Sequence, residues 1–221
     1  AEENKTIALD YREMAPAAAS RDMFLKSNGE VDNQLARDSL KSSGVPGTVA
    51  GLLYAQEKYG QLTLKKVIQP AIDLAAEGIA VNVDLSSSIK SRARRLKRDP
   101  STRRYFFKED GTFYELGDKL VQSDLADSLR RIAANGRSGF YQGKTAQLIT
   151  DQMKRSGGLI SLDDLKNYRV VERAPVCADF KANKICSMPP PSSGGIHLLQ
   201  MLNILEPWDL KALGHNSAAY I

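Results

Sequence analysis

The 221-residue sequence is short of the residues and patterns on which several classes of protein depend. Two cysteines are too few for a disulfide framework. Together with the two histidines they lack the spacing of a metal site. No apolar run approaches the roughly 20 residues that a membrane helix needs. The first residues, 1–5, are polar and acidic, unlike a signal peptide. These shortages favour an ordinary globular chain and imply neither a metal nor an organic cofactor.

The overall composition is that of a folded protein. Hydrophobic residues make up 42% of the chain and charged residues 26%, which is enough for one sizeable core. The net charge of +5 is mildly basic and does not by itself call for nucleic acid as a partner.

Hydrophobic periodicity and turn residues predict a helix-rich α+β chain with few strands. Alternation predicts a strand over residues 6–12, and hairpins are expected at Asp110-Gly111 and at Lys181-Ala182. Pro70 is expected to divide residues 64–77 into two short helices, since proline disrupts helical hydrogen bonding. Further helices are predicted over residues 17–25, 48–59, 83–97, 124–135, 144–155 and 194–205. A short helix is also expected after Ser161, which with Asp164 gives a start resembling a capping box.

Three short segments carry a family resemblance. Residues 10–16 read Asp-Tyr-Arg-Glu-Met-Ala-Pro, residues 45–51 read Val-Pro-Gly-Thr-Val-Ala-Gly, and residues 188–195 read Met-Pro-Pro-Pro-Ser-Ser-Gly-Gly. They resemble the D-[FY]-R-E-x-A-P, [TV]-P-G-[TE]-V-x-G and P-P-P-S-S-G-G segments of gamma-glutamyltranspeptidases. One segment alone is modest support, but three in the right order extend the resemblance over nearly the whole chain.

The resemblance implies part of the αββα sandwich of the N-terminal nucleophile hydrolases. In this family a precursor cleaves itself, and the new N-terminal threonine of the small subunit becomes the nucleophile, with its own amine as base. The enzyme transfers the gamma-glutamyl group of glutathione and related amides to water or amino acids. Residues 1–221 would then be a single fragment of the large subunit, without its N-terminal portion and the catalytic small subunit, and inactive alone.

The same resemblance leaves alternatives within the enzyme class. A cephalosporin acylase-like enzyme or a poly-gamma-glutamate depolymerase would share these large-subunit segments. The expected partners are gamma-glutamyl substrates such as glutathione and the small subunit of the same precursor. A fragment that exposes apolar surface is also expected to associate with itself. The family resemblance further implies a periplasmic or extracellular location.

Arg12 is the candidate substrate-binding residue. A free alpha-carboxylate is best held by a donor that is always charged and binds through two parallel hydrogen bonds, which favours arginine. The resemblance assigns position 12 to the alpha-carboxylate of the substrate. The alternative is a structural ion pair of Arg12 with Asp10 or Glu13.

Ser193 and His197 are four residues apart and could face each other on one helical turn. No acid is placed by the sequence to orient the histidine, so a catalytic pair is disfavoured. The preferred interpretation is that the prolines deliver a serine N-cap and that Gly194 and Gly195 allow close packing.

Residues 90–104 are strongly basic and raise a hypothesis of another class, a polyanion-binding module. Ile89, Ala93 and Leu96 fall on one helical stripe, which leaves the basic side chains on the outer face. No aromatic residues alternate with them to form a stacking platform for bases. A solvated helix face is therefore preferred, and no nucleic acid is expected as a partner.

Cys177 and Cys186 would stand opposite each other if Lys181-Ala182 forms a two-residue turn. Counting outward from the turn gives a non-hydrogen-bonded pair, where side chains approach most closely. A cross-strand disulfide and two free thiols both remain open on this ground.

Overall fold

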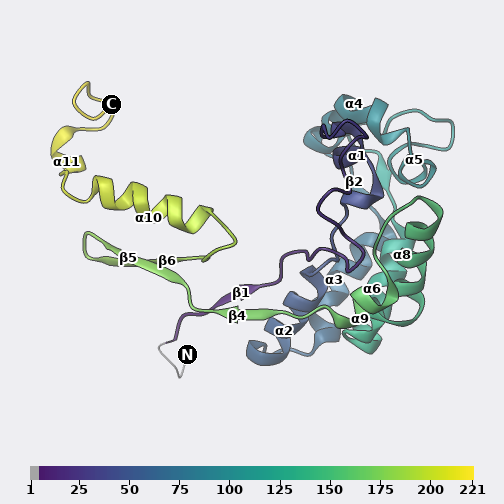
Figure 1. Cartoon of the computed structure of the whole chain (residues 1–221). Helices are drawn as coiled ribbons and strands as arrows, with labels where there is room; N and C mark the ends of the chain where they lie inside the picture. The colour runs from purple at the N-terminus through teal and green to yellow at the C-terminus, as the bar shows by residue number, and fades with distance from the viewer. Residues whose placement is uncertain (1–4) are drawn as a thin grey trace. The chain divides into compact units, whose positions relative to one another are not determined.

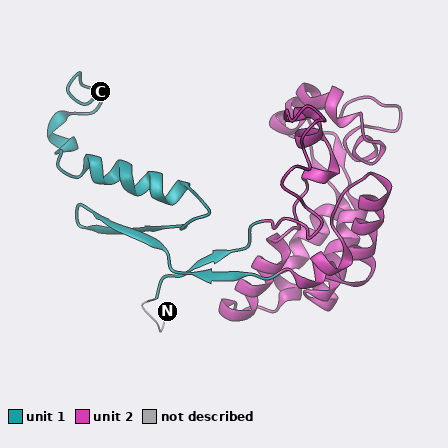
Figure 2. Cartoon of the chain, in the orientation of Figure 1, with its two compact units in different colours: residues 1–12, 169–221 teal, residues 13–168 magenta. Residues whose placement is uncertain are grey.

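The computed structural model describes residues 5–221, so most of the polar start of the chain lies outside it. The chain forms two compact units, which Figure 2 distinguishes by colour. One unit combines residues 1–12 with residues 169–221, and the other contains residues 13–168. Two distant parts of the sequence therefore build the first unit.

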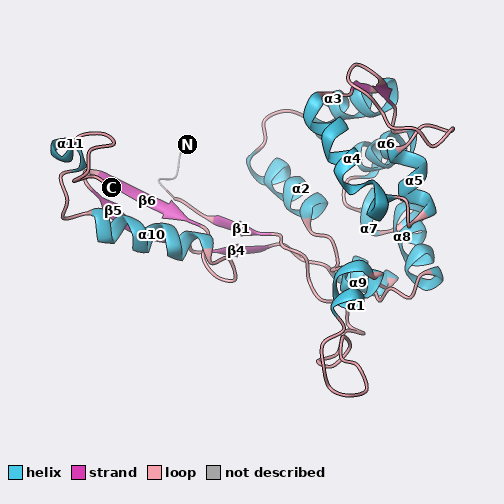
Figure 3. Cartoon of the chain, turned by 90° about the horizontal axis from the view of Figure 1, so that it is seen from above, coloured by secondary structure: helices cyan, strands magenta, loops and turns pink. Residues whose placement is uncertain are grey.

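Helices predominate in the unit of residues 13–168 (Figure 3). Helix α3 (Leu64–Glu77) packs against α6 (Ser123–Asn135), and α7 (Ser138–Tyr141) packs against both α6 and α8 (Gly143–Arg155). Small and aliphatic side chains fill these contacts: Ile72, Ala75, Ala126, Ile132 and Ala146 are buried. Their burial supplies the hydrophobic stabilisation of the unit.

This unit also has further helices and one pair of short strands. It contains α1 (Asn33–Asp38), a 3-10 helix (Leu40–Ser42), α2 (Thr48–Tyr59), α4 (Val83–Leu96), α5 (Pro100–Phe106), α9 (Leu162–Asn167) and the antiparallel pair of β2 (Ile79–Ala80) and β3 (Lys119–Leu120). The predicted capping box at the start of α9 is confirmed, since Ser161 and Asp164 exchange both of its hydrogen bonds.

The predicted division of residues 64–77 at Pro70 and the helix predicted over residues 17–25 were wrong. Residues 64–77 form one continuous helix with Pro70 inside it, because packing of α3 on α6 outweighs one missing hydrogen bond and Pro70 faces solvent. Residues 17–25 form turns rather than a helix. So short a helix is marginal in water, and hardly any of these side chains are buried enough to stabilise it.

Tyr141 caps α2 from a distance of 91 residues in the sequence. The N-cap residue, Gly47, has no side chain with which to cap the helix. The hydroxyl of Tyr141 instead accepts a hydrogen bond from the Ala50 backbone N–H at 3.1 Å and donates to the Pro46 carbonyl at 2.7 Å. Burial raises the pKa of Tyr141, which keeps the proton that it donates. The residue thereby fixes the Val-Pro-Gly-Thr-Val-Ala-Gly segment.

Replacing Tyr141 with phenylalanine is expected to lower the free energy of unfolding by about 1–2 kcal/mol, because two largely buried backbone groups lose their partner. Hydrogen exchange should accelerate at the Ala50 amide, and a urea titration would measure the global loss. Tyr220→Phe is the matched control, since that exposed side chain should contribute less than about 0.5 kcal/mol. Unchanged protection at Ala50 in the Tyr141 variant would contradict the capping role.

In the part of the chain that the structure describes, the other unit contains two strand pairs and two helices (Figure 1). Strand β1 (Ala8–Asp10) pairs antiparallel with β4 (Val171–Arg173), and β5 (Val176–Phe180) forms a hairpin with β6 (Asn183–Ser187). Helix α10 (Gly194–Leu205) packs against this hairpin and is followed by the short α11 (Leu210–Leu213). The strand predicted over residues 6–12 is thus shorter than expected.

Candidate functional site

Arg12 lies two residues beyond β1 and is exposed. Its backbone N–H donates to Asp10 Oδ1 at 3.3 Å, while Arg173 Nε donates to Asp10 Oδ2 at 2.7 Å. The hydrogen bond from Arg173, followed by that from the Arg12 backbone, holds the pKa of Asp10 below its ordinary value. The Asp10 carboxylate therefore has a close ion-pair partner in Arg173. The role of Arg12 towards substrate stays a prediction.

The contact between Asp10 and Arg173 could not be seen in the sequence, because the two residues are 163 positions apart. The contact depends on the register of the antiparallel pair of β1 and β4, in which Ala8 faces Arg173 and Asp10 faces Val171. Arg173 thus reaches the carboxylate diagonally across the two strands. The pair fixes the strand from which Arg12 emerges.

The segment Pro-Pro-Pro-Ser-Ser-Gly-Gly leads from β6 into α10. Ser193 lies at the expected N-cap position of α10, but it is itself in a helical conformation and its side chain makes no capping hydrogen bond. The His197 backbone N–H donates to the Ser193 carbonyl at 3.0 Å, as in any helix. Among residues 5–221 no hydrogen bond joins their two side chains, so the structure gives a catalytic pair no support.

The two glycines of this segment differ in their surroundings. A Cβ atom on Gly195 would lie 2.2 Å from the Met188 carbonyl oxygen and 3.1 Å from the Ser187 side chain. On Gly194 the nearest heavy atom would be 3.7 Å away, in Ser192. The predicted close packing is therefore present at Gly195, where α10 meets the end of β6.

The hairpin has the predicted register. Phe180 and Asn183 flank the two-residue turn, and Cys177 faces Cys186. Their Cα atoms are 4.2 Å apart and a disulfide joins the two sulfur atoms.

The turn of the hairpin is tied to the end of α10. The Lys181 backbone N–H donates to both carboxylate oxygens of Glu206, at 3.0 and 2.8 Å. Its Nζ donates to the carbonyls of Glu206 and Trp208. Hairpin and helix therefore form one small body, fastened at the turn and packed closely at Gly195.

Several cations of the basic segment, residues 90–104, form ion pairs with neighbouring acids. Lys90 pairs with Glu115, and Asp38 accepts from Arg95 at 2.6 Å and from Arg98 at 3.2 Å. Ile89 on the inner face is buried, whereas the basic side chains of this segment are exposed. This arrangement matches the predicted solvated helix face.

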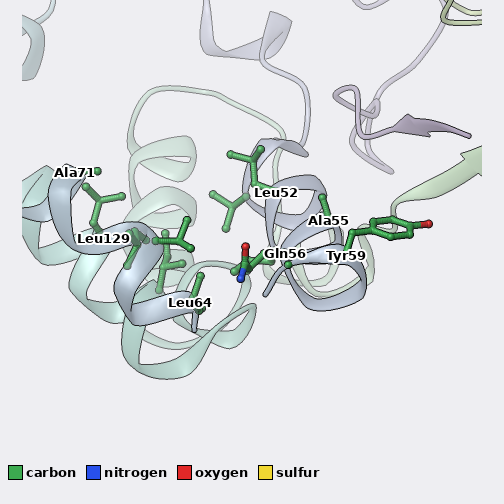
Figure 4. A pocket seen from close by; sticks show the side chains of 13 residues that line it. Leu52, Ala55, Gln56, Tyr59, Leu64, Ala71 and Leu129 are labelled. Atoms are coloured by element: carbon green, nitrogen blue, oxygen red, sulfur yellow. The ribbon is translucent and has the colours of Figure 1, made fainter. Parts of the chain in front are cut away.

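An apolar groove of about 550 Å³ lies between α2, α3 and α6. Figure 4 shows its side chains, with Leu52 on α2, Leu64 and Ala71 on α3, and Leu129 on α6. Gln56 also lines it, and its side-chain amide donates to the Leu62 carbonyl. The groove carries no charged side chain and so offers apolar contact rather than acid–base chemistry.

Comparisons with known proteins identify the family. The family model described as gamma-glutamyltranspeptidase matches residues 1–221. The chain belongs to the gamma-glutamyltranspeptidase family. It is 46% identical over 213 residues to the glutathione hydrolase proenzyme of Escherichia coli K12, a match that covers 96% of this chain and 37% of that relative. The chain therefore spans little more than a third of such a relative.

Solved structures agree with this assignment. A gamma-glutamyltranspeptidase from Helicobacter pylori matches with a TM-score of 0.94 and 44% identity, covering 97% of this chain and 61% of the other. A cephalosporin acylase from Bacillus halodurans matches with a TM-score of 0.78 and 26% identity, covering 92% and 38%. The predicted fold class, a helix-rich α+β part of an N-terminal nucleophile hydrolase sandwich, is confirmed.

Proposed function

We propose that the full-length protein carrying this chain transfers the gamma-glutamyl group of glutathione and related amides to water or amino acids. The observation that carries the proposal is the family match along residues 1–221, reinforced by the relative from Escherichia coli that is named a glutathione hydrolase proenzyme. The reaction would pass through an acyl-enzyme on a threonine outside this chain. Neither His197 nor His215 follows a threonine by two residues, so the 221-residue chain alone would be inactive.

Within that reaction we assign Arg12 to the alpha-carboxylate of the donor. The support is its place in the Asp-Tyr-Arg-Glu-Met-Ala-Pro segment and its position just after a strand held by the pair of Asp10 and Arg173. A guanidinium group matches a carboxylate through two parallel hydrogen bonds.

The proposed macromolecular partner is the remainder of the same precursor, as a separate small subunit. Helix α10 supports this partner, because apolar side chains lie both on the face that packs on the hairpin and on an exposed face. Leu199 is 7% exposed, whereas Met201 is 55% and Ile204 70% exposed. Left uncovered, this face and the groove of Figure 4 favour self-association of the chain.

We also propose a periplasmic or extracellular location. The bond between Cys177 and Cys186 supports it, because disulfides persist mainly in oxidising compartments. In residues 5–221 the structure contains no helix long and apolar enough to cross a membrane.

The activity is tested by comparing two anilides that differ in one group. Gamma-glutamyl anilide and glutaryl anilide share the carbon chain and the terminal carboxylate, but the second lacks the alpha-amino group. The full-length protein should cleave the gamma-glutamyl compound with a kcat/KM about a hundredfold higher or more, since a site built to bind an amine leaves its polar groups unpaired with the analogue. Faster cleavage of the glutaryl compound would reject the proposal in favour of an acylase.

A further inference from the structure

A second cavity in the unit of residues 13–168 has a different character from the apolar groove. It measures about 580 Å³ and lies where the end of α4, helix α5 and the hairpin of residues 107–114 meet. Its wall carries four cations, Lys97, Arg103, Arg104 and Lys108, and one carboxylate, Glu109. A concave surface with this excess of positive charge attracts anions.

Two of these cations are already engaged. Lys108 forms an ion pair with Asp118 at 2.6 Å. The Nζ atom of Lys97 lies 4.8 Å from the ring centroid of Phe107 and 5.3 Å from that of Phe113. Lys97 is thus held against these two rings, of which Phe107 lines the cavity, by cation–π attraction.

Arg103 and Arg104 are the two cations left without an acid. Both are exposed on α5, and neither takes part in an ion pair among residues 5–221. Among the nearby acids, Glu109 on the cavity wall forms no ion pair with either arginine in the described residues. The others are hydrogen-bonded to different groups: Asp99 to Thr102, Asp110 to Thr112, Glu115 to Lys90 and Asp124 to Tyr105. The two guanidinium groups therefore keep their capacity for an anion from solution.

The surroundings of the arginines indicate the kind of anion. Arg103 Nη2 lies beside the hairpin turn, 3.6 Å from where a Cβ atom on Gly111 would stand. Phe107, which is buried, and Tyr114 supply aromatic surface to the same cavity. Guanidinium groups bind carboxylate or phosphate oxygens bidentately, and the rings suit a short apolar part of a ligand.

We propose that this cavity binds a small organic polyanion, with two or more carboxylate or phosphate groups held by Arg103 and Arg104. Its volume lies within the range of small-molecule sites. None of its residues belongs to the three segments on which the family resemblance rests. The proposal is therefore independent of the proposed transferase activity, and its test measures binding alone.

The test is calorimetric titration of the full-length protein at low ionic strength. Citrate represents a polycarboxylate, pyrophosphate a polyphosphate, and acetate a monoanion control. The cavity variant is Arg103→Gln with Arg104→Gln. Its matched control is Arg92→Gln with Arg94→Gln, which removes the same charge from exposed positions of α4. Thermal melting would confirm that both variants remain folded.

The cavity variant is expected to bind the preferred probe about tenfold more weakly or worse, because each arginine contributes charged hydrogen bonds. The control variant should change the affinity by less than about twofold. The tighter of citrate and pyrophosphate identifies the source of the anionic groups. Equal losses in both variants would show a diffuse field instead of a site and overturn the proposal, as would the absence of saturable binding of either polyanion.

Discussion

Replacing Arg12 with lysine in the full-length protein is expected to raise KM for a gamma-glutamyl donor about ten- to a hundredfold. Lysine keeps the charge but loses the planar pair of donors that a carboxylate accepts. A hydrogen bond to a charged group contributes about 1.5–3 kcal/mol, and each 1.4 kcal/mol is about tenfold in affinity. Because the donor keeps this contact throughout the reaction, kcat should change little.

A donor without the alpha-carboxylate separates a binding role of Arg12 from a structural one. A 4-aminobutanoyl anilide lacks only that group, so Arg12→Lys should leave its KM nearly unchanged, and the two losses should not add. Arg21→Lys is the matched control, because the Arg21 side chain is 96% exposed. A lower melting temperature with an unchanged KM for the gamma-glutamyl donor would reject the assignment and make Arg12 a structural residue.

Replacing Gly195 with alanine is expected to destabilise the body of hairpin and α10 by about 3 kcal/mol, the upper part of the range for overpacking. The new methyl group would lie 2.2 Å from the Met188 carbonyl oxygen. That atom belongs to the backbone and cannot rotate aside, so α10 would have to move away from β6. Hydrogen exchange over residues 183–205 and the urea midpoint would measure the loss.

Gly194→Ala is the control for this prediction. It makes the same chemical change one residue earlier, where the nearest atom is 3.7 Å away. Alanine favours a helix over glycine by about 0.5–1 kcal/mol, so this variant should be neutral or slightly more stable. Equal stability of the two variants would show that the contact at Gly195 carries no packing constraint.

Local patterns predicted much of the fold. Residues 48–59 form the expected helix, and the Ser161 capping box and the hairpin register are observed as predicted. In these cases the determining residues lie within a few positions of one another. The errors at Pro70 and at residues 17–25 have the opposite cause, since tertiary packing on α6 stabilises the first segment and the lack of packing leaves the second without a helix.

The candidate site was less predictable because its supports join distant parts of the chain. Arg12 stands out through its segment, but the ion pair of Asp10 with Arg173 depends on strand pairing. Ser193 occupies the N-cap position without a side-chain capping bond because of its own backbone angles, which the identity of the residue does not determine. Sequence patterns therefore predict candidate site residues such as Arg12, whereas long-range contacts between strands and helices determine how those residues are positioned.

The Tyr141 hydroxyl has a consequence for the order in which the chain becomes ordered during synthesis. The ribosome makes Ala50 91 residues before it makes the group that caps its helix. Until α7 emerges, the first turn of α2 must leave those backbone groups to water, and such long-range closure is slow relative to local helix formation. The first turn of α2 therefore stays without this cap until Tyr141 has been synthesised, so the local helix precedes its long-range capping contact.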